Sequence, residues 1–153
     1  MTKFKILGFC FTVVLALALT AGAQTAPPVL NTIGSQSVNE GQNLNFTVTA
    51  TDADGTVAAL STSTLPVNAS FIDNGDGTGT FNFDPDYTQA NTYNVTFYAA
   101  DTVTTDIDSE IVAITVNNVN LAPAITPIAD TTIAENQLLT ITVNSSDADG
   151  TTP

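Results

Sequence analysis

The acidic stretch Asp-Ala-Asp-Gly-Thr occurs twice, at residues 52–56 and again, letter for letter, at residues 147–151. Two carboxylates separated by one residue and followed by glycine suit a hard cation, which prefers oxygen ligands. The same pattern also suits a tight turn, because aspartate bonds its own backbone and glycine accepts a positive φ. Both interpretations remain open from these residues alone. A Ca²⁺ site would need further oxygens, since this ion takes six to eight ligands.

The composition restricts the chemistry that the chain can perform. It has 153 residues and a net charge of −13, and its only basic residues are Lys3 and Lys5. Nucleic-acid and phosphate binding depend on Lys and Arg, and serine nucleophiles depend on a His or Lys base. With one cysteine (Cys10) and no histidine, the usual zinc sites are excluded as well. We therefore expect a protein that is not an enzyme and binds no nucleic acid.

Residues 1–23 have the pattern of a secretory signal peptide. Lys3 and Lys5 precede an apolar run over residues 6–19, and small residues follow at positions 21–23. Cleavage after Ala23 would remove Cys10 and leave a fragment without a membrane span, since the apolar run is too short to cross a bilayer stably. We expect a secreted protein that is extracellular or held at the cell surface.

From residue 28 onward the chain alternates between apolar and polar residues in short segments separated by turn residues. This period of two is typical of half-buried β-strands. In residues 44–50, for example, Leu44, Phe46, Val48 and Ala50 should share one face. The expected strands cover residues 29–33, 36–39, 43–51, 57–60, 69–72, 80–83, 93–99 and 111–116, and the fold class is all-β.

A shift of 95 residues aligns positions 28–56 with positions 123–151 without a gap, and 12 of the 29 pairs are identical. A period near 100 residues with about seven strands predicts tandem Greek-key seven-strand β-sandwich domains. Residues 24–120 would form one domain, and residues 121–153 the N-terminal part of a second, incomplete copy. Leu139, Ile141 and Val143 should then be exposed on an unpaired sheet, because so few strands cannot bury an apolar face.

Several motifs resemble those of cadherin-like domains: Asp52 to Gly55, Glu40 twelve residues earlier, and the linker over residues 118–123. Residues 37–41, 47–52 and 92–97 are especially similar to bacterial dystroglycan-type and Ig-like repeats. The resemblance implies a Ca²⁺ cluster between successive domains. Its ligands would be Glu40, Asp86, Asn118, Asn120, Asp147 and Asp149. A second, less complete set, which would face a preceding domain, consists of Asp52, Asp54 and Asp101.

Electrostatics favours a cation wherever these carboxylates converge. Two carboxylates about 4 Å apart repel by about 4 kcal/mol at an effective dielectric constant near 20. The expected mature chain has no basic side chain to offset this repulsion. Extracellular modules bind Ca²⁺ with dissociation constants of about 10⁻⁴ to 10⁻³ M. For each carboxylate, a solvated residue in a turn remains the alternative.

These observations predict a structural or adhesion module of a tandem-repeat array, stiffened by Ca²⁺ between its domains. Its partners would be neighbouring repeats of the same chain and cell-surface proteins or glycans. The alternative is a carbohydrate-binding or spacer module of an extracellular polysaccharide-degrading enzyme. For that role, Tyr87 and Tyr98 are the aromatic candidates, since the chain lacks tryptophan.

Overall fold

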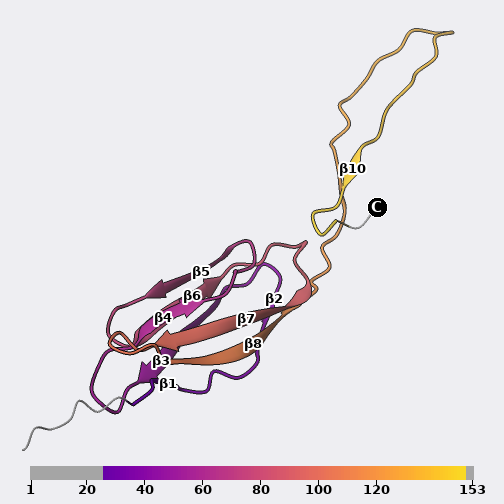
Figure 1. Ribbon diagram of the computed structural model, residues 1–153. Coiled ribbons are helices and arrows are strands. Elements are labelled where there is room, and N and C mark those ends of the chain that lie inside the picture. Colours follow the sequence, from indigo (N-terminus) through magenta and orange to yellow (C-terminus); the bar gives the residue numbers. More distant parts are fainter. Residues whose placement is uncertain (1–25, 151–153) are drawn as a thin grey trace, which may run out of the picture.

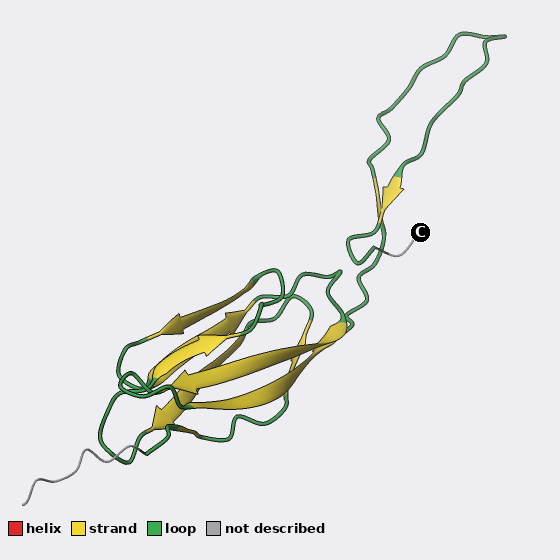
Figure 2. Cartoon of the chain, in the orientation of Figure 1, coloured by secondary structure: helices red, strands yellow, loops and turns green. Residues whose placement is uncertain are grey.

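The computed structural model describes residues 26–150, so the predicted signal peptide lies outside the described part of the chain. Within it the secondary structure is entirely strand and loop (Figures 1 and 2), which confirms the all-β prediction. The strands are β1 Val29–Leu30, β2 Gln36–Asn39, β3 Leu44–Thr51, β4 Ala59–Thr62, β5 Ala69–Asp73, β6 Thr78–Phe83, β7 Asn91–Ala100, β8 Ile107–Asn117, β9 Ala124–Ile125 and β10 Ser145–Ser146.

The first eight strands form two four-stranded sheets with the orders β1-β3-β6-β5 and β2-β8-β7-β4. Strands β2 and β8 run parallel, and the other neighbours in these sheets are antiparallel. This order separates the strands as an immunoglobulin-type sandwich does, with the first, third, sixth and fifth strands in one sheet. The predicted Greek-key β-sandwich is therefore confirmed, with the first strand divided between the sheets as β1 and β2.

The two sheets enclose a core that the alternating sequence segments supply. Phe81, Phe97 and Ile114 are fully buried, and the rings of Phe81 and Phe97 pack edge to face with centroids 5.8 Å apart. Val48 is buried together with its partly buried neighbours Leu44, Phe46 and Ala50. In the expected strands over residues 93–99 and 111–116, every second residue likewise points toward the core. Because side chains alternate across a strand, local sequence was sufficient to assign these faces.

The predicted strand over residues 29–33 is longer than the observed β1, which ends at Leu30. The amide of Asn31 still bonds the carbonyl oxygen of Thr49. Beyond Asn31 the chain crosses from one sheet to the other, and carboxylates accept hydrogen bonds from its amides. The carboxylate of Glu110 accepts hydrogen bonds from the amides of Ile33 and Gly34, both at 2.9 Å. Asp108 accepts one from the amide of Leu30 at 2.8 Å. Two acidic side chains of β8 thus support the crossing.

The described chain enters and leaves the sandwich at opposite ends (Figure 1). The entry end contains β1, the turn after β3 and the loop between β7 and β8. The exit end contains Glu40, the corner over residues 84–90 and the linker over residues 118–122. This arrangement follows from the strand directions: β3 and β7 both end at the entry end, whereas β2, β6 and β8 end at the exit end.

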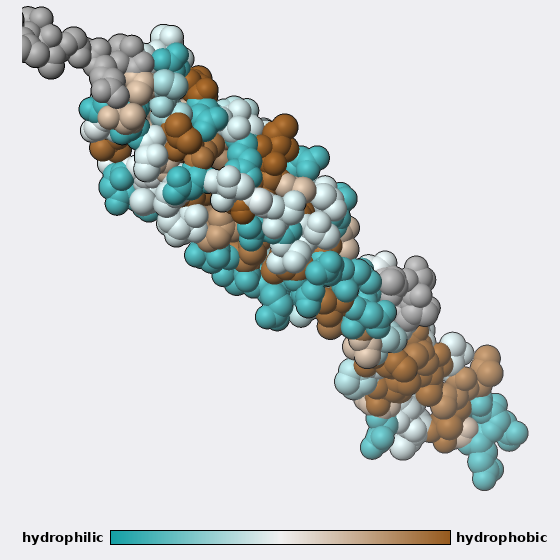
Figure 3. Space-filling view, turned by 90° about the horizontal axis from the view of Figure 1, so that it is seen from below, coloured by the Kyte–Doolittle hydropathy of each residue, from teal (hydrophilic) through white to brown (hydrophobic). Residues whose placement is uncertain are grey.

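Residues 121–150 form an open hairpin that extends from the exit end (Figure 1). The pairing at its base repeats that of the sandwich after the 95-residue shift, since Ala124 faces Ser146 as Val29 faces Thr51. Its exposed aliphatic side chains include Leu139, Ile141 and Val143, as predicted. Figure 3 shows a brown, hydrophobic area on this segment. The hairpin thus repeats the backbone pairing of the sandwich without its packing.

Candidate metal sites at the two ends of the sandwich

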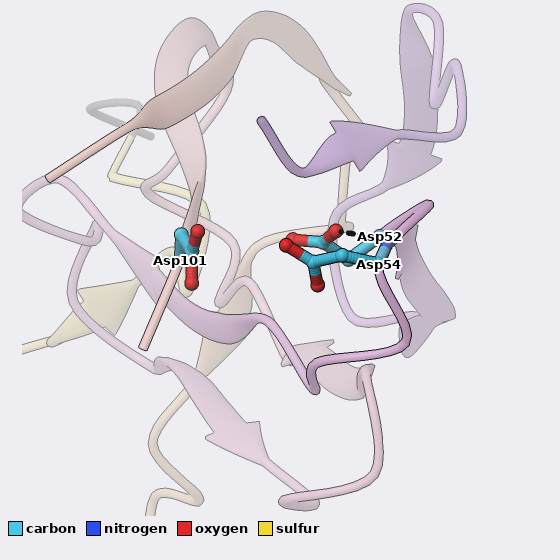
Figure 4. Close-up of side chains that lie close together, drawn as sticks. All are labelled: Asp52, Asp54 and Asp101. Carbon is cyan, nitrogen blue, oxygen red and sulfur yellow. Dashed lines mark hydrogen bonds between the residues drawn. The ribbon is translucent and has the colours of Figure 1, made fainter. Parts of the chain in front are cut away.

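Three carboxylates converge at the entry end. Asp52 and Asp54 lie in the turn that follows β3, and Asp101 directly follows β7. One oxygen from each lies within 4.8 Å of the others, the one such group of acidic side chains found in residues 26–150. Figure 4 shows Asp52 and Asp54 side by side and extending toward Asp101. The set that sequence reasoning ranked second is therefore the one that the fold brings together most closely.

The turn after β3 holds two of these carboxylates in place through its own backbone. Oδ1 of Asp52 accepts a hydrogen bond from the amide of Asp54, and Oδ1 of Asp54 accepts one from the amide of Thr56, both at 3.0 Å. Gly55 closes the turn with a φ of 85°. The turn interpretation is thus correct, and it is compatible with metal binding, since each carboxylate keeps a second oxygen. Oδ2 of Asp52 is buried and accepts no hydrogen bond from the described residues.

Asp101 is the most buried member of this group, with 7% of its surface exposed. The amide of Val103 donates to its Oδ1, and the hydroxyl of Thr104 donates to its Oδ2, both at 2.7 Å. These two bonds hold the pKa of Asp101 below its ordinary value. A hydrogen bond from the Thr56 amide likewise lowers the pKa of Asp54, although the nearby charge of Asp101 opposes that shift. Both side chains are therefore ionised at neutral pH.

This arrangement suits a hard divalent cation. It offers carboxylate oxygens without a soft ligand, and no basic side chain lies in the described residues to neutralise them. Three carboxylates provide part of the six to eight oxygens that Ca²⁺ takes, and water or backbone carbonyls can complete the set. Among the described residues, no donor forms a hydrogen bond to the buried Oδ2 of Asp52, so this oxygen is available to a cation. The residues present thus fit the cation that the family resemblance implies.

At the exit end, Glu40 is almost completely buried, with 2% of its surface exposed. Its Oε1 accepts a hydrogen bond from the amide of Ala90 at 2.7 Å, and its Oε2 accepts one from the amide of Val119 at 2.9 Å. Asp86 accepts bonds from both the amide and the hydroxyl of Thr88. The hydroxyl bond is the largest cause that lowers the pKa of Asp86. Both carboxylates therefore have structural partners in the corner or the linker.

The second acidic turn lies against this end. Asp149 Oδ2 accepts a 2.8 Å hydrogen bond from the amide of the linker residue Leu121. A Cβ placed on Gly150 would lie 3.9 Å from Cγ2 of Thr88, so the turn lies beside the corner. As in the first turn, the amide of Asp149 bonds Oδ1 of Asp147, here at 3.3 Å.

The remaining predicted ligands, Asn118 and Asn120, lie in the linker, where Nδ2 of Asn120 donates to the carbonyl oxygen of Leu121. The six exit-end residues thus lie in segments that meet at this junction. In residues 26–150, however, the acidic side chains found close enough together to share an ion are those of the entry end. A shared ion at the exit end stays a prediction.

Comparison with known proteins identifies the fold and leaves the family open. No protein-family model matches the chain, and no curated protein matches its sequence. The sialic acid binding region of an adhesin from Streptococcus sanguinis is similar in structure, with a TM-score of 0.53 and 15% identity over 61% of this chain and 30% of that one. The SrpA adhesin of the same organism gives a TM-score of 0.52 and 15% identity over 70% of this chain and 67% of that one.

An endo-fucoidan hydrolase of glycoside hydrolase family 107 is similar over 61% of this chain and 14% of its own, with a TM-score of 0.50 and 17% identity. Several of these matches thus span well under two thirds of the proteins they match. At such low identity they support the β-sandwich fold. No helix in residues 26–150 is long and apolar enough to cross a membrane.

Proposed function

We propose that this chain is a non-enzymatic structural and adhesion module of an extracellular tandem-repeat array, and that Ca²⁺ stiffens it at the ends of its domains. The convergence of Asp52, Asp54 and Asp101 at the entry end is the observation that carries this proposal. The role as a module draws support from the repeated sequence, from the end-to-end course of the chain and from the fold shared with adhesin regions. The same turn sequence at residues 147–150 lies against the exit end of the sandwich, where Leu121 bonds Asp149.

The physical mechanism is the neutralisation of converging charge. Without a cation, the carboxylates at each end repel one another, and the loops that carry them separate more readily. A bound Ca²⁺ ion would attract the turn after β3 and the loop after β7 at the entry end. At the exit end it would join Glu40 and Asp86 to Asp147 and Asp149 across the linker. The array would therefore be stiff in millimolar Ca²⁺ and more compliant without it.

Thermal unfolding of the exported chain in 10 mM CaCl₂ and in EDTA tests this proposal. At a hundredfold excess of Ca²⁺ over its dissociation constant, one site adds about 2.7 kcal/mol of stability. We expect a rise in Tm of several degrees, and no comparable rise in 10 mM MgCl₂, because Mg²⁺ demands a smaller octahedral site. An unchanged Tm in CaCl₂ would contradict the calcium proposal.

A further inference from the structure

The outer face of the sheet β2-β8-β7-β4 is free of charge around Tyr98, in a chain that carries 15 acidic residues. The acidic residues in the strands of this sheet are Asp108 and Glu110 of β8. Both lie on the same side of β8 as the buried Val112, and their carboxylates accept hydrogen bonds from backbone amides of residues 30–34. They therefore point away from the outer face. We call the outward residues Ser61, Thr96, Tyr98, Ile107, Ser109 and Ile111 the neutral face.

The strand register places Tyr98 at the centre of the neutral face. On one side it pairs with Ser61 of β4, and on the other with Ser109 of β8. Ile107 and Ile111 lie diagonally across from it on β8, with exposed fractions of 63% and 70%. Toward the exit end the face continues with hydroxyl groups, and the Oγ1 atoms of Thr92 and Thr115 lie 3.4 Å apart. The ring of Tyr98 and two isoleucine side chains thus lie beside the hydroxyl groups of Ser61, Thr96 and Ser109. Ala59 and Ala100 are further outward neighbours.

The opposite sheet provides a useful contrast. Directly after β6, Asp84 accepts hydrogen bonds from Asn43 and Asn82, so a carboxylate borders that sheet at the exit end. Tyr87, the other aromatic candidate from the sequence, packs at the corner against Gly41. Of the two predicted tyrosines, Tyr98 is therefore the one on a broad uncharged surface.

We propose that the neutral face binds an uncharged polysaccharide, which stacks on the ring of Tyr98 and exchanges hydrogen bonds with the flanking hydroxyl groups. This inference rests on the proposed function as an extracellular module and supplies the class of its partner. Tyrosine presents an apolar ring face and a polar hydroxyl, which match the apolar and hydroxylated sides of a sugar. Neutral hydroxyl donors and acceptors pair with sugar hydroxyls without the desolvation of a charge.

The absence of basic side chains in residues 26–150 favours an uncharged polysaccharide over an anionic one. Recognition of carboxylated or sulfated sugars is best served by Arg or Lys, and residues 26–150 contain neither. A second copy of this chain is the competing occupant, since interface centres are also depleted in charge. However, four of the six residues of the neutral face carry a hydroxyl group, and a dimer would have to bury these against one another. A hydroxylated partner satisfies them directly.

Binding of the exported chain to cellulose, curdlan, chitin and mannan, with alginate as an anionic probe, tests the inference. We expect binding to at least one neutral polymer and none to alginate. Tyr98→Ala should weaken this binding at least about tenfold, whereas Tyr98→Phe, which keeps the ring, should retain most of it. Ser109→Asp should also weaken it, because the substitution places a charge beside Tyr98. The matched variant Thr47→Asp changes an exposed position of the other sheet and should bind normally.

Thermal unfolding of each variant identifies any loss of fold. If Tyr98→Ala is unstable, Ser109→Asp tests the same face at an exposed position. The proposal would be overturned if the chain bound none of the neutral polymers. It would also be overturned if Tyr98→Ala and Ser109→Asp both bound as tightly as the parent chain. Sedimentation that shows a dimer lost in Ser109→Asp would also overturn it, because the face would then join two copies. Repeating the binding in EDTA separates this inference from the calcium proposal. The neutral face lies outside the carboxylate clusters. Polysaccharide binding can therefore fail while the Ca²⁺-dependent rise in Tm is observed, and the reverse is also possible.

Discussion

The amide of Val119 donates a 2.9 Å hydrogen bond to Oε2 of Glu40, so a buried carboxylate at the end of β2 holds the beginning of the linker. The other oxygen of Glu40 accepts a bond from the amide of Ala90, just before β7. One side chain thus connects three segments that are distant in sequence. Since Glu40 is almost completely buried, water does not readily replace either bond.

Glu40→Gln should therefore destabilise the sandwich. The amide nitrogen of glutamine would face a backbone N–H inside the buried site of Glu40, and one hydrogen bond would be lost, at a cost of about 1–3 kcal/mol. Urea unfolding measures this loss in EDTA, where no metal contributes. Glu135→Gln is the matched control, because Glu135 occupies the equivalent position of the repeat and is exposed. Its effect should stay within about 0.5 kcal/mol, and an equal loss in both variants would contradict the structural role of Glu40.

Local alternation predicted which side chains of each strand point inward. It did not predict which side chains bond the backbone where the chain crosses between the sheets after β1. Leu44, Phe46 and Val48 lie inside because side chains alternate along any strand, whatever its partner. Glu110, by contrast, bonds the amides of Ile33 and Gly34, which precede it by 77 and 76 residues. Nothing local to Glu110 indicates these partners. Its role depends on β8 passing beside the point where the chain changes sheets.

Topology also explains why the candidate metal site that the sequence favoured is not the one whose carboxylates lie closest together in the structure. Both candidate sets came from the family resemblance, which favours the set at the junction between two successive domains. Asp101 reaches Asp52 and Asp54 because β3 and β7 end at the same end of the sandwich. The signal in the sequence was an aspartate at the end of each of two strands. The resemblance grouped these residues, and the arrangement of the strands gives the physical reason why the two strand ends meet.

Asp52→Asn should raise Tm in the absence of Ca²⁺ and should reduce the further rise in Tm that Ca²⁺ produces. In EDTA, the variant loses one of three mutually repelling charges and gains an amide beside Asp54 and Asp101. We expect a rise in Tm of about 2–5 °C. In 10 mM CaCl₂ the rise that the metal produces should shrink, because a carboxylate ligand is lost. Asp130→Asn, at an exposed position of the hairpin, should leave the response to Ca²⁺ intact. Equal responses in the two variants would contradict metal binding at the entry end.

Acid should destabilise the fold below about pH 4. Hydroxyl bonds from Thr78 and Thr88 are the largest causes that hold the pKa values of Asp76 and Asp86 below the ordinary value. On unfolding, these carboxyls return to a pKa of about 3.9, so the unfolded chain binds protons at a higher pH than the folded chain. The stability that these bonds contribute is therefore complete above the unfolded value. It is lost as the pH falls through the lowered folded values.

Thr88→Val tests this dependence at a single carboxyl. The substitution removes the hydroxyl donor, so the pKa of Asp86 should rise toward its ordinary value in an NMR titration. Thr47→Val changes an exposed threonine of β3 and should not alter that pKa. If Asp86 titrates identically in Thr88→Val and the parent chain, the hydroxyl bond does not stabilise the charge.

Gly41→Ala should destabilise the exit end more than Gly34→Ala destabilises the crossing after β1. Both glycines have a positive φ, 71° for Gly41 and 69° for Gly34, which costs an alanine about 1–2 kcal/mol. A Cβ on Gly41 would also lie 2.5 Å from the hydroxyl oxygen of Tyr87, whereas one on Gly34 would meet nothing within 4 Å. The difference between the losses in free energy of unfolding of Gly41→Ala and Gly34→Ala measures the cost of the contact with Tyr87. Equal losses would show that Tyr87 moves aside freely.

Val48→Thr and Val143→Thr compare equivalent positions of the two repeat copies. Val48 is 1% exposed in the core of the sandwich, and Val143 is 57% exposed on the hairpin. A hydroxyl group buried at position 48 without an assured partner should cost about 1–3 kcal/mol, whereas the change at position 143 should stay within about 0.5 kcal/mol. Urea unfolding followed by tyrosine fluorescence measures both, because the tyrosines Tyr87, Tyr93 and Tyr98 belong to the sandwich. A comparable loss in both variants would mean that the hairpin packs as the sandwich does, and that its aliphatic side chains are covered in solution.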